Sequence, residues 1–380
     1  MIKGKHSGAD LTIFAEMSAL AQRNEAVNLS QGFPDYEIDE KLKKLLAEAT
    51  AKNFNQYAPM AGNPVLIDNL ITFNAARKNP ITLAVENITV TPGASYGIYT
   101  ALAAVLSFGD EVIVLEPTYD SYVPAIEING GTPVFVPLND NFEIDFTALS
   151  NAITHKTKAI IINSPHNPSG KIWRKKDFDD LAELLHNSPI YIISDEVYDV
   201  LTYDESEFYS AFQHPQLKNS TFSIFSFGKM FHVTGWKVGY VLASEELTIA
   251  FRKIHQYLSF SVNAPAQFAL ANYLEIFDVE ANRLQMQQKR DFFVDAFREL
   301  PFTLKEKAEA GYFQILGYEN ISALPDKAFA GWLTEHAKVA SIPISAFYKN
   351  NVNTQTVRFC FAKKEETVLE AANNLKKFLP

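Results

Sequence analysis

Short apolar runs rich in β-branched residues alternate with helical stretches through the middle of the chain, from residue 88 to residue 244. This alternation is typical of a parallel, doubly wound sheet with helices on both faces. Three helical stretches lie at residues 95–107, 119–129 and 175–186. The strands that we expect lie at residues 88–90, 111–115, 132–136, 158–163, 190–195, 222–227 and 238–243. The pattern therefore predicts a large three-layer α/β domain with a mostly parallel sheet.

The order of expected helices and strands changes after about Ala281. A long polar helix comes first, followed by short strands around residues 312–316 and 356–361 and a closing helix from Lys364. This order predicts a smaller α+β domain. The turn-rich stretch at residues 29–34 is expected to return the N-terminal segment to that domain. We predict an N-terminal segment at residues 1–35, a large domain at 36–280 and a small domain at 281–380.

Composition and charge exclude several classes of function. A net charge of −10 argues against nucleic acid as the main partner, because phosphate binding needs a basic surface. No apolar run is long enough to span a bilayer, so we expect no membrane partner. Cys360 is the single cysteine, which suits a reducing compartment, and Glu16 interrupts the first apolar stretch, which is unlike a signal peptide. We expect a cytoplasmic protein without a metal site.

Polar residues follow several of the expected strands, where ligands bind in open parallel sheets. Lys229 comes just after the strand at residues 222–227, and a partly desolvated lysine there can form an imine. Ser226 and Lys237 lie three positions before it and eight after it, and they offer a hydroxyl and a second cation to a phosphate. A second lysine would also lower the pKa of Lys229. The alternative is that Ser226 only ends a strand and Lys237 is a surface charge.

Asp195 ends the apolar strand at residues 190–195, and Tyr198 lies three positions after it. A buried carboxylate at Asp195 would need a partner, and a protonated pyridine nitrogen is one that fits. Tyr198 could then form a hydrogen bond with the hydroxyl of the same ring. The alternative for Asp195 is a helix N-cap.

Two further polar groups lie near strands. Asn167 stands in a turn with two X-Pro dipeptides and a glycine, which would hold its amide in one place to recognise a ring oxygen and a carboxylate. The alternative is an ordinary Asn-Pro turn. Arg358 lies between large apolar residues in an alternating strand, where burial favours a bidentate carboxylate as partner. A structural pair of Arg358 with Asp or Glu stays open.

The stretch Thr91, Pro92, Gly93, Ala94 and Ser95 joins the first strand to a helix. Its small residues leave backbone N–H groups open at a helix N-terminus, which suits one phosphate. The dinucleotide and P-loop glycine patterns are absent from it. A simple turn is the alternative.

Tyr119 follows the strand at residues 111–115 and could lay its ring on a flat cofactor. The alternative for Tyr119 is core packing.

Taken together, these motifs resemble the class I/II aminotransferases of fold type I, which depend on pyridoxal 5′-phosphate, over essentially the whole chain. The resemblance is carried by N-P-x-G at residues 167–170, D-E-x-Y at 195–198, S-x-x-K at 226–229 with G-W-K-V-G at 235–239, and R-F-x-F at 358–361. Residues 31–35, 55–59 and 255–260 look most like the methionine aminotransferases and the kynurenine–glutamine transaminases.

The resemblance implies roles for particular residues. Lys229 would form the imine, Asp195 would pair with the pyridinium, and Tyr198 and Asn167 would contact the ring oxygen. Tyr119 would cover the ring, with Gly93, Ala94, Ser95, Ser226 and Lys237 around the cofactor. Arg358, Asn167 and Gly32 would bind the substrate. The resemblance also implies a homodimer with shared active sites, in which Tyr57 reaches the phosphate of the partner's cofactor.

Two positions depart from the broad family pattern. Lys237 stands where an arginine is common in the family. The kynurenine-type subgroup also has a lysine at this position. Residues 310–313 read A-G-Y-F rather than G-T-Y-F, which bears on the shape of the small-domain wall.

The predicted function is transfer of the α-amino group of methionine, phenylalanine, tyrosine or kynurenine to a 2-oxo acid. Of the eight arginines, only Arg358 falls in a recognisable site motif, so the side-chain pocket should be apolar. Phe33, Tyr119, Phe260 and Tyr312 are candidate walls. Two alternatives stay open: a cysteine-conjugate or cystathionine β-lyase on the same fold, and a non-catalytic binding protein.

Overall fold

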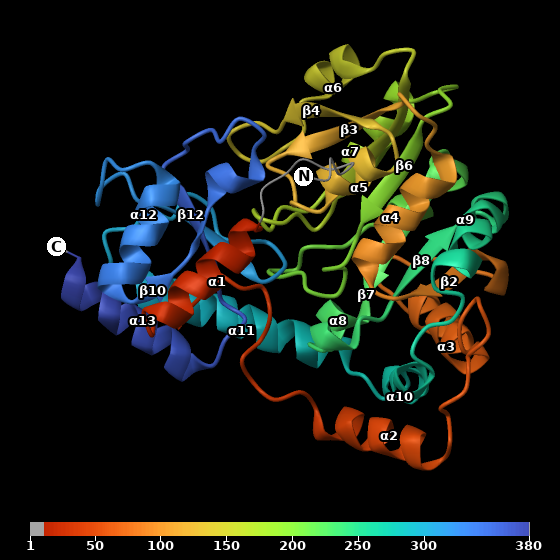
Figure 1. Cartoon of the computed structure of the whole chain (residues 1–380), viewed down its shortest axis with the longest axis horizontal. Coiled ribbons are helices and arrows are strands. Elements are labelled where there is room, and N and C mark those ends of the chain that lie inside the picture. Colours follow the sequence, from red (N-terminus) through yellow and green to blue (C-terminus); the bar gives the residue numbers. More distant parts are fainter. Residues whose placement is uncertain (1–10, 380) are drawn as a thin grey trace, which may run out of the picture.

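The computed structural model describes residues 11–379 and contains a seven-stranded sheet in the order β2-β8-β7-β6-β5-β3-β4 (Figure 1). The chain is α/β, as the alternation in the sequence predicts. The strands are β2 (Ile88–Thr91), β3 (Glu111–Glu116), β4 (Thr132–Pro137), β5 (Thr157–Asn163), β6 (Tyr191–Asp195), β7 (Thr221–Ser226) and β8 (Gly239–Ala243).

β8 runs antiparallel to both of its neighbours, β2 and β7, whereas the pairs among β3, β4, β5, β6 and β7 are parallel. The sheet is therefore mostly parallel, as predicted, and β8 is its antiparallel strand. The connection from β7 to β8 holds only the four-residue helix α8 (Phe227–Met230) and a short 3-10 turn. No helix there is long enough to carry the chain back along the sheet, as a parallel crossover requires.

The sheet is buried on both faces, which explains the continuous apolar runs of its strands. In β5, Ile161 packs in one core cluster with helices α4, α5 and α9, and Ile160 packs in the other with α6 and α7. The layers are thus helix, sheet and helix. These helices are α4 (Ala94–Val105), α5 (Tyr122–Ile128), α6 (Phe146–Ala152), α7 (Lys175–Leu184) and α9 (Glu245–Leu258).

The residues after the large sheet build a second, three-stranded antiparallel sheet in the order β11-β12-β9. In it Arg358 pairs with Ile315 and Ile342. The elements of this region are α11 (Val279–Phe297), β9 (Phe313–Gly317), α12 (Asp326–Trp332), a π-helical turn at Leu333–Ala337, β10 (Val339–Ala340), β11 (Ile342–Pro343), β12 (Thr356–Cys360) and α13 (Glu365–Phe378).

The N-terminal segment packs against this second region rather than the large sheet. α1 (Ile13–Arg23) leads into β1 (Val27–Asn28), which pairs in parallel with β10. α1 contacts β10, and Figure 1 shows both on the opposite side of the picture from α9 and β2. Residues 1–10 and 380, which the predicted boundaries include, lie outside the described residues. The boundaries at 35 and 280 stay a prediction.

Three further helices pack together: α2 (Glu40–Ala51), α3 (Pro64–Ala75) and α10 (Ala264–Leu274), with α10 packed on both of the others. Within residues 11–379, no helix is both long enough and apolar enough to cross a membrane.

Three details of the sequence-based expectation are wrong at element ends. Phe227 begins α8 rather than ending β7, so Lys229 lies in a short helix. Tyr119 lies in the turn before α5, which begins at Tyr122. α4 and α7 end two residues earlier than expected. Apolar patterns continue past element ends into residues that cap or pack, and such boundaries depend on tertiary contacts.

Candidate active site

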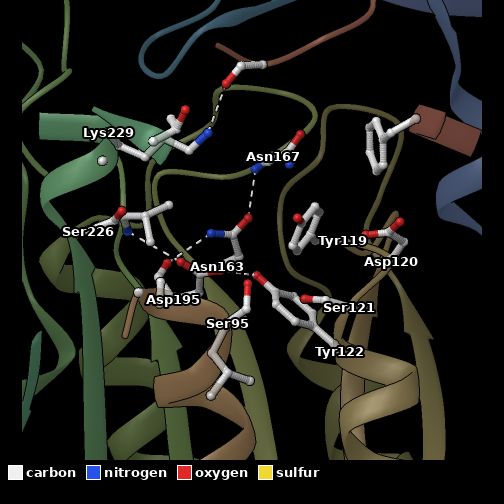
Figure 2. Close-up of a pocket in the computed structure, with 18 of the residues that line it drawn as sticks. Ser95, Tyr119, Asp120, Ser121, Tyr122, Asn163, Asn167, Asp195, Ser226 and Lys229 are labelled. Atoms are coloured by element: carbon white, nitrogen blue, oxygen red, sulfur yellow. Dashed lines mark hydrogen bonds between the residues drawn. The ribbon is translucent and has the colours of Figure 1, made fainter. Parts of the chain in front are cut away.

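A cavity of about 740 Å³ lies where the strand ends of the large sheet meet the N-terminal segment and β12 (Figure 2). Every residue expected to act in catalysis or to bind the cofactor or the substrate carboxylate lines it, except Tyr57. The lining includes Gly32, Gly93, Ala94, Ser95, Tyr119, Asn167, Asp195, Tyr198, Ser226, Lys229, Lys237 and Arg358. These residues come from positions between 32 and 358, so the fold alone brings them together.

The amine of Lys229 is removed from bulk water. Its Nζ donates a hydrogen bond to the carbonyl oxygen of Gly32 at 2.9 Å and lies 5.5 Å and 5.4 Å from the ring centres of Tyr198 and Tyr312. Burial lowers the pKa of Lys229 to about 8, with Arg358 and Lys237 contributing in the same direction. The predicted effect of a second lysine has the right sign, but desolvation is the largest cause. Part of the amine is therefore neutral and nucleophilic near neutral pH.

The carboxylate of Asp195 is buried at the end of β6. Its Oδ2 accepts a hydrogen bond of 2.6 Å from the hydroxyl of Tyr122, and its backbone oxygen accepts one of 2.9 Å from Nδ2 of Asn163 (Figure 2). Burial raises the pKa of Asp195 to about 6, and the Tyr122 hydroxyl opposes this rise. No helix begins at Asp195, so the N-cap alternative is wrong. The group can accept a cationic ring nitrogen.

A chain of amides connects β5 to β12. Oδ1 of Asn163 accepts from the backbone N–H of Asn167 at 2.8 Å, and Oδ1 of Asn167 accepts from Nη1 of Arg358 at 2.7 Å. Both X-Pro bonds of this turn, after Ser164 and after Asn167, are cis. The two hydrogen bonds hold Asn167 between the sheet and the arginine.

Arg358 is 1% exposed, and its guanidinium carbon lies 3.7 Å from the ring centre of Phe313 and 5.2 Å from those of Phe14 and Phe347. Nη2 donates to the carbonyl oxygen of Ser30 at 2.9 Å. Burial lowers the pKa of Arg358 to about 10.

Nε of Arg358 has no hydrogen-bond partner, and no carboxylate of the described residues forms an ion pair with this side chain. The alternative of a structural pair with Asp or Glu is thus wrong. A buried cation with an unused donor can receive an anionic ligand.

The opposite end of the cavity can bind an anion. Gly93 caps α4 with a φ of 84°, and no side chain caps the first N–H groups of that helix. A Cβ at position 93 would lie 3.3 Å from Nζ of Lys237, so the lysine amine sits directly over the glycine. Open N–H groups, the helix dipole and a cation favour a phosphate here.

Two of the candidate pocket walls do not line the cavity of the single chain. Tyr312 is fully buried outside it, where its hydroxyl donates to the carbonyl oxygen of Lys229 at 2.8 Å and lies 2.7 Å from Nδ1 of His232. The next residue, Phe313, lines the cavity instead. Phe260 is 47% exposed and packs edge-on against Tyr57, with ring centres 5.7 Å apart. Phe33 and Tyr119 do line the cavity, as expected.

Three functional residues escaped the sequence analysis: Tyr122, Asn163 and Phe313. A weak signal existed for two of them. Tyr122 follows Tyr119 by three positions, about one helical turn. Asn163 is the last residue of a strand whose carboxyl end was expected to lie at the ligand site. Phe313 lies next to Tyr312 and points to the other side.

Comparisons with known proteins agree with this geometry. The family model for aminotransferase class I and II matches residues 24–375. The methionine aminotransferase of Escherichia coli K12 is 40% identical over 369 residues, 96% of this chain and 95% of that protein. A probable kynurenine–oxoglutarate transaminase of Saccharomyces cerevisiae is 34% identical, covering 93% of this chain and 87% of that protein.

Solved structures give the same result. A crystal structure from Escherichia coli with a methionine aminotransferase function superposes with a TM-score of 0.96 at 39% identity, over 100% of both chains. The N-succinyldiaminopimelate aminotransferase of Mycobacterium tuberculosis superposes with a TM-score of 0.94 at 34% identity, over 99% of this chain and 100% of that one.

The cavity also fits the cofactor of this family, pyridoxal phosphate. It holds a desolvated lysine, a carboxylate suited to a pyridinium and an open helix N-terminus with a lysine above it. It also holds a buried arginine with an unused N–H. On the family match, the two relatives and the shared fold, the chain belongs to the class I and II aminotransferases, which depend on pyridoxal phosphate.

Proposed function

We propose that this aminotransferase moves the α-amino group of methionine or an aromatic amino acid to a 2-oxo acid. The observation that carries the proposal is the meeting of Lys229, Asp195 and Arg358 in one cavity. The names of the relatives, a methionine aminotransferase and kynurenine transaminases, support the substrate class.

Each residue has a role that its surroundings support. Lys229 carries the cofactor and, when freed, moves a proton from the substrate's α-carbon, for which a pKa of about 8 suits a group that must both accept and donate. Asp195 pairs with the ring nitrogen, and Asn167 and Tyr198 contact the ring oxygen. Bound pyridoxal phosphate supplies a conjugated ring that accepts electrons from the α-carbon.

The remaining groups bind the phosphate of the cofactor and the carboxylate of the substrate. Lys237, Ser226 and the start of α4 at Gly93, Ala94 and Ser95 hold the phosphate. Arg358 and Asn167 bind the substrate carboxylate, next to Gly32, and Tyr119 covers the ring face. Phe14 and Phe33 give the side-chain region apolar walls, which accept methionine and aromatic side chains with weak discrimination between them.

We further propose a homodimer with shared active sites, to which Tyr57 of each subunit contributes at the partner's phosphate. Tyr57 is 84% exposed in the single chain and contacts only the partly exposed Phe260 among aromatic rings, which supports a role across an interface. We also propose a cytoplasmic location, supported by the buried free thiol of Cys360. The division into residues 1–35, 36–280 and 281–380 is part of the same proposal.

Replacement of Lys229 tests the function. Lys229→Ala should lower turnover of methionine with an oxo acid by at least about a thousandfold, because no other described amine reaches the same position. The variant should still bind pyridoxal phosphate through the phosphate contacts. The exposed Lys175→Ala is the matched control and should keep full activity. Appreciable turnover by Lys229→Ala would overturn the assignment. Sustained release of pyruvate and ammonia from a cysteine conjugate without an oxo acid would point to a β-lyase.

A further inference from the structure

The backbone carbonyl of Lys229 belongs to a chain of side-chain hydrogen bonds that the proposed reaction does not use. The hydroxyl of Tyr312 donates to this carbonyl oxygen at 2.8 Å, and Nδ1 of His232 lies 2.7 Å from the same hydroxyl. Nε2 of His232 lies 3.0 Å from Oδ1 of Asn282. Tyr312 directly precedes β9, Asn282 lies in α11, and His232 follows α8 by two residues. The chain of hydrogen bonds therefore connects the backbone of Lys229 to α11 and to the three-stranded sheet.

The carbonyl of Lys229 needs such a donor because α8 is short. α8 contains four residues, and the last four carbonyls of a helix have no partner inside it. The donor comes from Tyr312, which is fully buried, and the ring centre of the same side chain lies 5.4 Å from Nζ of Lys229. One side chain thus contacts both the backbone and the amine of Lys229.

His232 fixes the direction of this hydroxyl. A carbonyl oxygen only accepts, so the single proton of the Tyr312 hydroxyl points to Lys229, and the hydroxyl oxygen accepts from Nδ1 of His232. Burial lowers the pKa of His232 to about 4, so the ring is neutral near neutral pH and Nδ1 carries its one N–H. Nε2 is then an acceptor. Nδ2 of Asn282 has no partner among the described residues, and a half-turn of this amide brings Nδ2 to Nε2.

We propose that His232 and Tyr312 are positioning residues for the transamination: together they fix the backbone of Lys229, so that its amine meets the α-carbon of the substrate in one place. The inference rests on the proposed aminotransferase function. Neither side chain lines the cavity, so both act through Lys229. A reacting group displaced by about 1 Å can lose up to about a hundredfold in rate, whereas the substrate carboxylate still binds at Arg358. Loss of either residue should therefore lower kcat and leave KM nearly unchanged.

Two substitutions at His232 separate its two hydrogen bonds. The backbone of His232 has a φ of 61°, a left-handed conformation that asparagine adopts more readily than most residues. His232→Asn places an amide N–H where Nδ1 lies and should keep the bond to Tyr312. His232→Gln places its amide farther out, near Nε2, and should keep only the contact with Asn282. Tyr312→Phe removes the hydroxyl and keeps the ring beside the amine of Lys229.

Steady-state kinetics with methionine gives the first measurement, on the wild-type holoenzyme and on these variants. His232→Gln and Tyr312→Phe should lower kcat by about tenfold or more, with KM changed by less than about twofold. His232→Asn should keep most of the wild-type kcat. Since the two damaging substitutions change different elements, either one decides the question if the other variant does not fold.

Hydrogen exchange gives a second measurement that does not depend on activity. It follows residues 227–232 in the full-length chain without pyridoxal phosphate. The amide of Phe231, which donates to the carbonyl oxygen of Phe227 at 2.9 Å, reports on opening of α8. This amide should exchange several-fold faster in His232→Gln and Tyr312→Phe than in the wild type, and at nearly the wild-type rate in His232→Asn.

Tyr318→Phe is the matched control. Tyr318 is also fully buried and follows β9, but its hydroxyl donates to the carbonyl oxygen of Leu324, at 2.8 Å. The control should keep the wild-type kcat, KM and exchange rate at Phe231. If it changes as Tyr312→Phe does, general loosening of this region explains the effect and the inference is wrong.

The two proposals fail in different ways. If His232→Gln and Tyr312→Phe transaminate methionine with the wild-type kcat and exchange at the wild-type rate, the positioning role is wrong and the proposed function stands. If the wild-type holoenzyme transaminates neither methionine nor an aromatic amino acid, the proposed function fails. Exchange at Phe231 then still shows whether the chain of hydrogen bonds holds α8.

Discussion

At the scale of single residues, burial is the largest cause of the shifted pKa values in this cavity. Desolvation lowers the pKa of Lys229 to about 8, raises that of Asp195 to about 6 and lowers that of Arg358 to about 10. Each shift moves the group toward its neutral form, so each gains from a ligand of opposite charge or from covalent use. A bound cofactor and substrate of opposite charge would therefore stabilise the charged forms of these buried groups.

The hydrogen bond from Tyr122 to Asp195 predicts a pH effect. Asp195 must be ionised to pair with a pyridinium, so cofactor affinity should rise as pH rises through about 6 and fall below it. Tyr122→Phe removes a donor that stabilises the carboxylate and should move this midpoint upward by about one pH unit. The measurement is the Kd of pyridoxal phosphate from about pH 5 to about pH 8.

The control for this experiment lies on the same strand. Tyr191 is at the other end of β6 from Asp195, so Tyr191→Phe should keep the wild-type midpoint. Identical midpoints in the two variants would show that Tyr122 does not tune Asp195.

At the scale of elements, the N-terminal segment and the small sheet together build one side of the cavity. Gly32 follows β1 and accepts from Lys229, and Ser30 accepts from Arg358. β12 carries Arg358 and β9 carries Phe313, paired so that Phe313 lies opposite Cys360. The segment before α2 is therefore part of the site, although it supplies no strand of the large sheet.

Close packing between these elements makes Gly32 sensitive. A Cβ at Gly32 would lie 2.5 Å from Cζ of Phe313, so Gly32→Ala should push that ring off the guanidinium of Arg358. We expect KM for the amino acid to rise about tenfold, because small displacements of a substrate-positioning group are costly. Steady-state kinetics with methionine measures this. Gly331→Ala in α12, where a Cβ meets nothing within 4 Å, should leave KM unchanged; equal KM values in both variants would contradict the account.

The same elements show what the sequence could predict. Lys229, Asp195, Asn167 and Arg358 were found because each lies on or near a strand whose apolar pattern is visible. Tyr122 was not, because its hydrogen bond depends on how α5 packs against β6. Tyr312 was assigned to the cavity in place of Phe313, since sequence spacing does not show which side of a strand entrance faces the ligand. The antiparallel direction of β8 depends on the length of a connection, which periodicity does not report.

At the scale of the whole molecule, the exposed aromatic residues on one chain call for a partner. Tyr57 and Tyr257 are 84% and 86% exposed, and Phe260 packs on Tyr57. Exposed rings of this size are unfavourable in water and support the proposed dimer, in which each cavity would be completed by the other subunit.

Subunit complementation tests this sharing. In a shared site, Lys229 comes from one subunit and Tyr57 from the other. A hybrid dimer of one Lys229→Ala subunit and one Tyr57→Ala subunit therefore contains one site with both residues intact. With random assembly, a co-expressed mixture should recover about a quarter of wild-type activity at limiting pyridoxal phosphate. Activity no higher than the average of the two parent variants would mean that each chain builds its own site.

The proposed transamination depends on Lys229. The most direct measurement is the absorption spectrum of the purified protein with pyridoxal phosphate, from about 300 to about 500 nm, before and after methionine is added without an oxo acid. We predict a visible band that bleaches with methionine or an aromatic amino acid in the wild-type protein, and no such wild-type band in Lys229→Ala. A wild-type protein that stays colourless with pyridoxal phosphate, or whose band is unchanged by every amino acid tried, would contradict the account.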